Sequence, residues 1–348
     1  MGNVIAYSGI STKIRAMQKK LLSEAELKKL SEFRLSVQKA EYLSGFPAYR
    51  LLFQNAGEQG FHRMELERRL ALSLMQDFDR LYHFADGEQK RFMKLYFQHY
   101  EVILVKRSLQ IVLSGRPAPF EFTLYEDYIR KYARIDLIRL SQCKDLAEFI
   151  EALAGTPYGK LLKRFYESGN AGNADYETAI DMRYFTTMWR LKDKELPKEA
   201  KSILERTFGS RIDMLNLNWI YRSKKYFDLT PQEIYSLLIP IRCRISLEEM
   251  KKMVEAPGLT EFVAAERETC YGPRVQAFMK QDETLGQAQE ALLRHIYRSE
   301  ARKHPYSIAP INTYFFLKEK EVQEIIRIAE ETHYQDKSGQ GPVKEVLS

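Results

Sequence analysis

The chain has 348 residues, a hydrophobic fraction of 45% and a formal net charge of +7. That hydrophobic fraction is enough for packed cores and excludes wholesale disorder. Only 17 Gly and 12 Pro residues occur, and strong helix formers fill most segments, which favours helices over a turn-rich β fold. The 54 basic residues are interleaved with 47 acidic residues, as is typical of a solvated helical surface. A basic face that meets an acidic protein or lipid headgroups stays open as an alternative.

The cysteine content and the hydropathy pattern indicate a cellular setting. Cys143, Cys243 and Cys270 are an odd number of thiols at long spacings, so neither a disulfide framework nor a zinc site is indicated. No apolar run approaches the roughly 18–20 residues of a membrane span, and the start of the chain has no apolar signal segment. We therefore expect a cytoplasmic protein in a reducing compartment, which is still able to sit on a membrane complex.

Helix signals begin near the N-terminus with the capping box Ser23-x-x-Glu26. A turn at Gly45-x-Pro47 then separates two helical segments, because Gly tolerates left-handed backbone and Pro cannot continue a helix. The apolar spacing predicts a long helix over residues 92–112. Gly155-x-Pro157 predicts a second turn, and residues 168–174 predict a loop.

The second half of the chain continues the helical pattern. A long helix is predicted over residues 198–226, and we expect Trp219, Tyr226 and Phe227 to form a buried stripe at its end. Capping boxes that begin at Thr230 and Ser246 predict two further helix starts. The polar tail after His333 is expected to be frayed.

A repeat of about 110 residues runs through this helical chain. The segment LSGFPAYRLL that starts at Leu43 recurs as LAGTPYGKLL at Leu153, 110 residues later. A second series of acidic–apolar steps, separated by 112 and 108 residues, consists of Glu101-Val102, Asp213-Met214 and Glu321-Val322. The third copy is diverged, and we assign Ala256-Pro257-Gly258 to its turn.

The repeat predicts three helical domains of similar size. Their expected boundaries are 1–115, 116–228 and 229–348. The N-terminal helix of the first repeat is expected to pack with the other lobes, and the third repeat ends in the frayed tail. The three acids recur once per repeat, so we interpret them as helix-packing or surface salt-bridge residues rather than as a catalytic pair.

Motifs for catalysis and ligand binding are missing from the sequence. There is no phosphate-binding loop, no HExxH spacing among the six histidines and no nucleophile elbow. We therefore predict no catalytic residue, no cofactor, no metal and no small-molecule ligand.

Three stretches carry a family resemblance. The first extends from Tyr7 through Arg15 to Leu22, the second from Ile212 to Pro240, and the third is HPYSIAP at 304–310 with FLKEKEV after it. They resemble the C subunit of bacterial and archaeal V/A-type ATPases, whose eukaryotic counterpart is the V-ATPase d subunit. The positions that match the family pattern are Tyr7, Arg15, Glu101, Asp213, Asn216, Pro240, Pro305, Pro310 and Glu321. The first and third repeats depart from it, with Leu104 and Glu324 in place of Asn216.

The resemblance implies an all-α fold of three pseudo-threefold-related lobes that form a funnel. It also implies a non-catalytic rotor subunit in a hetero-oligomeric complex on the cytoplasmic face of the membrane. Such a protein couples the central shaft, made of the D and F subunits, to the membrane proteolipid ring. It transmits torque for ATP-driven H+ or Na+ transport or for ATP synthesis. From the basic excess we expect a cationic rim for the shaft, with Arg222, Lys224 and Lys225 as candidates.

Two other classes of protein remain as alternatives. A helical-repeat nucleic-acid-binding protein is favoured by the pI near 9.0 and by aromatic residues among basic ones, although we expect no nucleic-acid partner. A scaffold of stacked helix pairs is the other, but its usual period of about 33–47 residues is much shorter than the one found here.

Overall fold

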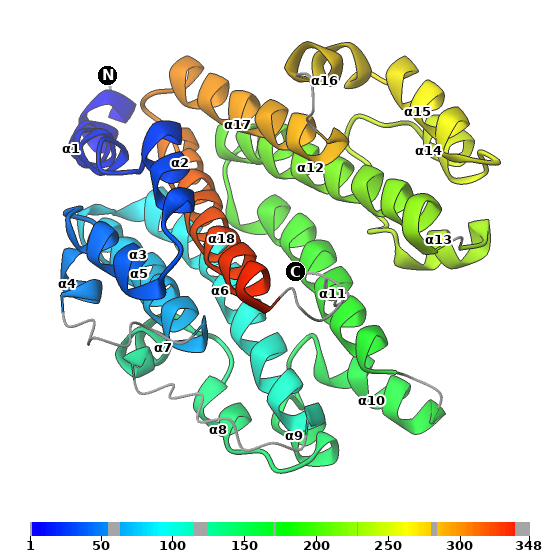
Figure 1. Cartoon of the computed structure of the whole chain (residues 1–348), viewed down its shortest axis with the longest axis horizontal. Coiled ribbons are helices and arrows are strands. Elements are labelled where there is room, and N and C mark those ends of the chain that lie inside the picture. Colours follow the sequence, from blue (N-terminus) through cyan, green and yellow to red (C-terminus); the bar gives the residue numbers. More distant parts are fainter. Residues whose placement is uncertain are drawn as a thin grey trace. The chain divides into compact units, whose positions relative to one another are not determined.

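The computed structural model describes residues 2–54, 63–114, 124–169, 172–227, 229–279 and 284–337 (Figure 1). These residues form eighteen α-helices and one π-helical turn, with no strand in the ranges described. The predicted all-α class is therefore confirmed. None of the described helices is long and apolar enough to cross a membrane. The end of the tail predicted to fray, residues 338–348, lies outside the described ranges, as do residues 170 and 171 of the predicted loop.

The chain divides into two compact units, which are described separately. Unit 1 consists of residues 1–85 and 310–348, and unit 2 of residues 86–309. Unit 1 thus joins the two ends of the chain. The three-lobed funnel stays a prediction.

Unit 1 is built around the C-terminal helix. Phe315 of this helix stacks on Phe78 at a ring distance of 5.6 Å, and Ile325, which is 1% exposed, lies near Leu30 and Leu43. The last helix therefore packs against the N-terminal helices. The helices of unit 1 are α1 (Gly2–Gln18), α2 (Glu24–Glu32), α3 (Ser36–Ser44), α4 (Arg50–Phe53), α5 (Arg63–Phe84) and α18 (Ala309–Lys337), the last from its second residue onward.

Unit 2 contains two long helices that each pack against the helices that follow them in sequence. The first, α6 (Gly87–Ser114), contacts α8 (Leu137–Ser141), α9 (Leu146–Ala152) and α11 (Asn173–Glu195). The second, α12 (Lys198–Arg222), contacts α15 (Leu259–Glu268) and α17 (Leu285–Lys303), and Figure 1 shows α12 and α17 side by side. The other elements of unit 2 are α7 (Glu126–Tyr132), α10 (Gly159–Ser168), the π turn η2 (Ser223–Phe227), α13 (Pro231–Leu237), α14 (Leu247–Val254) and α16 (Gly272–Phe278).

The two predicted Gly-x-Pro turns are present. One separates α3 from α4 and the other separates α9 from α10. Gly155 has a φ of 81°, a left-handed conformation that other residues adopt at a cost, whereas Gly45 is helical with a φ of −66°. Left-handed backbone is therefore needed at only one of the two turns.

The assignment of the third turn is corrected by the structure. Ala256-Pro257-Gly258 lies between α14 and α15. The turn that precedes α16 instead contains Thr269, Cys270 and Tyr271. Two buried tyrosines, Tyr158 and Tyr271, are the N-cap residues of α10 and α16, and they are separated by 113 residues. The turn before α16 is therefore the equivalent of the turn before α10, and Ala256-Pro257-Gly258 precedes it by one helix.

The predicted capping boxes are confirmed. The side chains of Ser23, Thr230 and Ser246 each accept a hydrogen bond from the backbone N–H three residues later, and the glutamate at that position bonds back to the cap. These helix starts depend on local interactions, so the sequence alone is enough to locate them.

The predicted buried stripe at the end of α12 is wrong, because Trp219 is only half-buried and the other two residues are exposed. Tyr226 is 60% exposed and Phe227 is 56% exposed. Both lie in η2, where the π-helical pairing places more residues in each turn. The buried face that the α-helical spacing predicts therefore does not continue through this segment.

Candidate functional site

The three recurring acids are all buried in the middle of long helices. Glu101 of α6 is 3% exposed, Asp213 of α12 is 0% exposed, and Glu321 of α18 is 4% exposed. The alternative that they form surface salt bridges is therefore excluded. Each accepts at least one hydrogen bond from a backbone N–H group of a loop that precedes another helix. We call each such arrangement an acid joint.

The joint of Glu101 lies in unit 2. Its Oε1 atom accepts hydrogen bonds from the backbone N–H groups of Arg134 and Ile135, the second at 3.2 Å. These residues lie just before α8. Burial raises the pKa of Glu101 to about 7, because the loss of solvent outweighs the two N–H donors that favour the charged form.

The joint of Asp213, also in unit 2, has both backbone and side-chain donors. The backbone N–H groups of Cys243 and Arg244 donate at 3.1 and 2.8 Å, and the Tyr271 hydroxyl donates at 2.9 Å. Burial raises the pKa of Asp213 and these donors oppose the rise. The loop they fix leads to α14.

The joint of Glu321 lies in unit 1. Its two carboxylate oxygens accept from the backbone N–H of Leu22 at 2.5 Å and from the Lys318 ammonium at 2.8 Å. Lys318 is itself 1% exposed and donates a second bond to the Tyr49 hydroxyl at 2.6 Å. A buried charge is thus paired and hydrogen-bonded, as its desolvation requires.

A buried tyrosine accompanies each joint. Tyr49, Tyr158 and Tyr271 hold the N-cap positions of α4, α10 and α16, and none is more than 4% exposed. Burial raises the pKa of all three, and the charge of the neighbouring acid adds to the rise. Tyr49 lies two residues after its turn proline and Tyr158 only one. An alignment of the repeats at a constant offset of 110 residues therefore does not superimpose these tyrosines, and the sequence analysis missed them.

The acid joints connect backbone segments to long helices. Their oxygens accept hydrogen bonds from backbone N–H groups and, for Asp213 and Glu321, from side chains of the same unit. Hydrogen bonds from backbone to a buried carboxylate hold a loop at a fixed place on a long helix. Each joint therefore fixes the start of a short helix on a long one.

Asn216 makes a further backbone contact in unit 2. Its Nδ2 donates to the carbonyl oxygen of Ile239 at 3.0 Å, and its Oδ1 accepts from the N–H of the same residue at 2.9 Å. This pair fixes the segment just before Pro240. Leu104 and Glu324, which replace Asn216 in the other repeats, cannot form it, because leucine has no polar group and a carboxylate has no donor.

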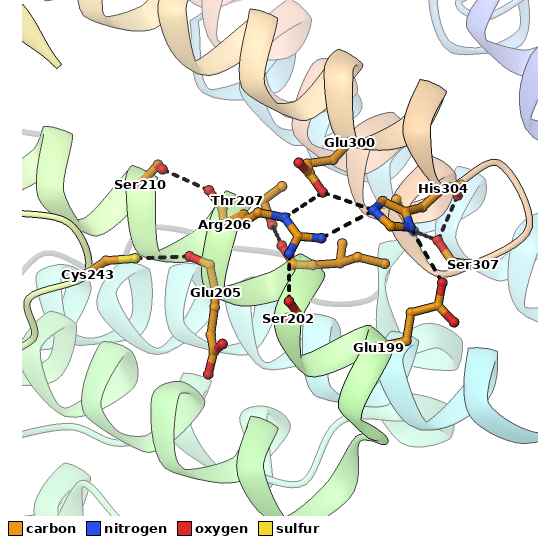
Figure 2. A network of polar contacts seen from close by, with 12 residues as sticks. Glu199, Ser202, Glu205, Arg206, Thr207, Ser210, Cys243, Glu300, His304 and Ser307 are labelled. Atoms are coloured by element: carbon orange, nitrogen blue, oxygen red, sulfur yellow. Dashed lines mark hydrogen bonds and ion pairs between the residues drawn. The ribbon is translucent and has the colours of Figure 1, made fainter. Parts of the chain in front are cut away.

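The third family motif begins in a polar network (Figure 2). Arg206 of α12 donates to Glu300 of α17 at 2.8 Å and to Ser202 at 2.6 Å. His304, at the end of α17, lies 3.5 Å from Glu199 at the start of α12. The network links the first half of α12 to the end of α17, so we interpret His304 as a structural residue.

The remaining motif positions are mainly structural. Tyr7 is 4% exposed in the core of unit 1, whereas Arg15 is exposed near the end of α1. Pro305 is half-buried and Pro310 is buried in the first turn of α18, where a missing N–H costs nothing. The sequence located these positions but not their contacts.

The three candidate residues for a shaft contact have different environments. Lys224 donates to the carbonyl oxygens of Val254 and Ala256 at 2.8 and 2.6 Å, so its ammonium binds the end of α14. Lys225 is exposed and lies 5.1 Å from the centre of the Tyr226 ring. Arg222 is half-buried. Lys225 is the best placed of the three to meet a partner.

Histidine, cysteine and acidic side chains do not gather into a metal site within the described ranges, since no group of three such residues could hold an ion.

Comparisons with known proteins agree on one family. A family model described as ATP synthase (C/AC39) subunit matches residues 10–338. The C subunit of the A-type ATP synthase of Thermococcus kodakarensis is 26% identical over 341 residues, which cover 92% of this chain and 84% of the relative. The relative of the same name from Pyrococcus horikoshii is 24% identical over 352 residues, covering 98% and 90%. That of Methanosphaera stadtmanae is 21% identical over 333 residues, covering 93% and 83%.

Proposed function

Because this chain belongs to the ATP synthase (C/AC39) subunit family of rotary A/V-type ATPases, we propose that it is the rotor subunit that couples the central shaft to the membrane proteolipid ring. In this role it carries no catalytic site and stands on the cytoplasmic face of the membrane. It transmits torque between the shaft, made of the D and F subunits, and the ring. The family match over residues 10–338 is the observation that carries the proposal.

The acid joints support a role under mechanical load. A torque-bearing protein must keep its helices fixed while force passes through them. Each joint uses hydrogen bonds to a charged or partly charged buried group, which are stronger than bonds between neutral groups. In unit 1, the joint of Glu321 and Leu22 ties the C-terminal helix to the N-terminal segment.

A surface at the end of α12 supports a contact with an acidic, partly apolar partner. It consists of Lys225, Tyr226 and Phe227, all exposed, and we call it the η2 surface. Exposed aromatic rings beside a cation are enriched in protein interfaces. A tip of the shaft with carboxylates around an apolar residue would suit it.

The test is a pull-down of the tagged chain from detergent-solubilised membranes. We expect the shaft subunits and the proteolipid to be recovered together, at a ratio that survives moderate salt. Recovery of neither would contradict the proposal.

A nucleic-acid-binding role is the second candidate, and the η2 surface is the observation in its favour. Bases stack on exposed aromatic rings beside cations. Titration of the chain with a single-stranded RNA of mixed sequence separates the two roles. The coupling role predicts no saturable binding at 150 mM salt.

A further inference from the structure

A polar cavity of about 180 Å³ lies within unit 1. Its volume has room for a small ion with several waters. Its lining comes from α1, from the segment between α1 and α2, from the turn before α4, from α5 and from α18. The lining residues are Lys13, Met17, Lys20, Leu21, Pro47, Ala48, Asp77, Arg80, Tyr314 and Lys318.

The most buried wall of the cavity is cationic. Lys318 is 1% exposed, and its ammonium has three N–H donors. Two of these donate to Tyr49 and Glu321. The ammonium also lies 4.0 Å from the centre of the Tyr49 ring. Because Lys318 lines the cavity, a ligand there would lie beside a buried positive charge.

The carboxylate in the wall is already occupied. Asp77 accepts from Arg80 at 3.2 Å through Oδ1 and from the Tyr314 hydroxyl at 2.5 Å through Oδ2. Both of its oxygens thus face groups of the protein, which makes the cavity a poor site for a cation. Its charge also neutralises only one of the surrounding cations.

The charge balance around the cavity favours an anion. Four cations line it, namely Lys13, Lys20, Arg80 and Lys318. Two carboxylates form hydrogen bonds with these cations, Asp77 with Arg80 and Glu321 with Lys318. At full ionisation the site therefore carries a charge of about +2.

We propose that this cavity, which we call the α1/α18 pocket, binds a small doubly charged oxyanion of the phosphate class. Lys318 donates from the floor, and Lys13, Lys20 and Arg80 supply charge from the rim. Lysine acts as a point charge toward phosphate, so Lys13 and Lys20 need no fixed fork geometry. The sequence predicted no small-molecule ligand, because the cations of the pocket come from three separate parts of the chain.

The test compares thermal unfolding of the full chain in 10 mM sodium phosphate and in sodium chloride of equal ionic strength and pH. We expect phosphate to raise the Tm by about 2 °C, with half-saturation of the pocket at about 1 mM phosphate. Phosphate also stabilises many proteins without a site. The decisive readout is therefore the difference between Lys20→Glu and Lys19→Glu.

Lys19 and Lys20 are neighbours and both are exposed, but only Lys20 lines the pocket. The Lys19→Glu variant should keep the phosphate shift, and Lys20→Glu should lose most of it, with affinity lower by about tenfold. Broadening of the phosphate ³¹P resonance should follow the same order. If Lys20→Glu folds poorly by circular dichroism, Lys20→Gln takes its place in both measurements.

Three outcomes would overturn the proposal. One is a phosphate shift that is equal in the two variants, and another is a shift that equal chloride reproduces. The third is an equal shift with 10 mM acetate, because a singly charged carboxylate would then satisfy the pocket. None of these outcomes bears on the coupling role.

Discussion

The backbone N–H of Leu22 donates a 2.5 Å hydrogen bond to the carboxylate of Glu321, although the two residues lie 299 positions apart. Glu101 and Asp213 bind loops that follow them in sequence by only 30 to 34 positions. The helix that holds Glu321 is the last one that the structure describes, and the donor to its carboxylate comes from an earlier segment instead of a later loop. The N-terminal segment takes that place and closes unit 1.

Replacement of Glu321 tests this closure. Glu321→Gln would leave the buried ammonium of Lys318 without its counter-charge, so we expect a loss of about 3 kcal/mol in the free energy of unfolding. Urea unfolding followed by circular dichroism measures it. Glu324→Gln is the matched control, because Glu324 lies on the same helix and pairs with Arg327 at the surface. Its change should stay within about 0.5 kcal/mol, and equal losses in the two variants would contradict the joint.

The pKa of Glu101 predicts a pH dependence of stability. In the folded protein this pKa is about 7, against an ordinary value of 4.5, so the fold favours the neutral carboxyl. The neutral carboxyl of Glu101 therefore contributes to the free energy of unfolding in full below about pH 4.5. This contribution, on the order of 3 kcal/mol, is lost as the pH rises through about 7. Glu101→Gln keeps an acceptor for Arg134 and Ile135 but cannot titrate. Its unfolding free energy should fall less than the wild type's between pH 4.5 and 7.5.

The control for this pH series is Glu167→Gln, at an exposed position of α10. It should follow the wild-type curve. If Glu101→Gln followed that curve as well, the pH dependence would belong to other groups.

Local features of this fold could be predicted from the sequence. The capping boxes at Ser23, Thr230 and Ser246 depend on residues within one turn, and the turn at Gly155 depends on one backbone conformation. The helical class follows from composition. The three acids were also found, because they recur at a spacing of about 110 residues.

Contacts between distant segments could not be predicted. The hydrogen bond from Leu22 to Glu321 joins segments 299 positions apart, and no periodic pattern in the sequence indicates it. The exposure of Tyr226 depends on the π turn, which breaks the α-helical spacing used to predict its burial. The role of Lys224 depends on two carbonyl groups about 30 positions away.

Glu266 is an unfavourable buried residue whose replacement should stabilise the protein. It is 0% exposed, and neither carboxylate oxygen has a hydrogen bond to the described residues. It lies five residues before Tyr271, as the buried Leu153 lies five before Tyr158. Burial raises the pKa of Glu266. Glu266→Leu should therefore raise the unfolding free energy at pH 7 by about 2 kcal/mol.

The measurement is urea unfolding at pH 7, with Glu268→Leu as the control. Glu268 lies two residues further on and pairs with Lys252 on the surface, so its replacement should have little effect. A Glu266→Leu variant that is less stable than the wild type would indicate that the carboxyl has a partner in solution.

Asn216 should be essential for the position of the segment before Pro240. Asn216→Leu places at this site the residue found at 104, removes both amide bonds to Ile239 and leaves a backbone N–H and C=O without partners. We expect a loss of about 3 kcal/mol, measured by thermal or urea unfolding. Asn218→Leu, on the same helix, should cost less than about 1 kcal/mol. A similar cost for both would show that helix propensity, rather than the amide pair, decides the result.

The coupling role makes a functional prediction that separates Lys225 from Lys224. Lys225→Glu reverses a charge on the exposed η2 surface, so it should weaken shaft binding in a salt-dependent way and leave the fold intact. Lys224→Glu instead removes two bonds to the end of α14 and should lower the Tm. In vesicles reconstituted with the whole complex, Lys225→Glu should keep ATP hydrolysis but lower ion transport, because the head and the ring would be mechanically uncoupled. Loss of hydrolysis in parallel with transport would contradict the coupling role. An unchanged transport-to-hydrolysis ratio at both low and high salt would exclude the η2 surface as the shaft contact.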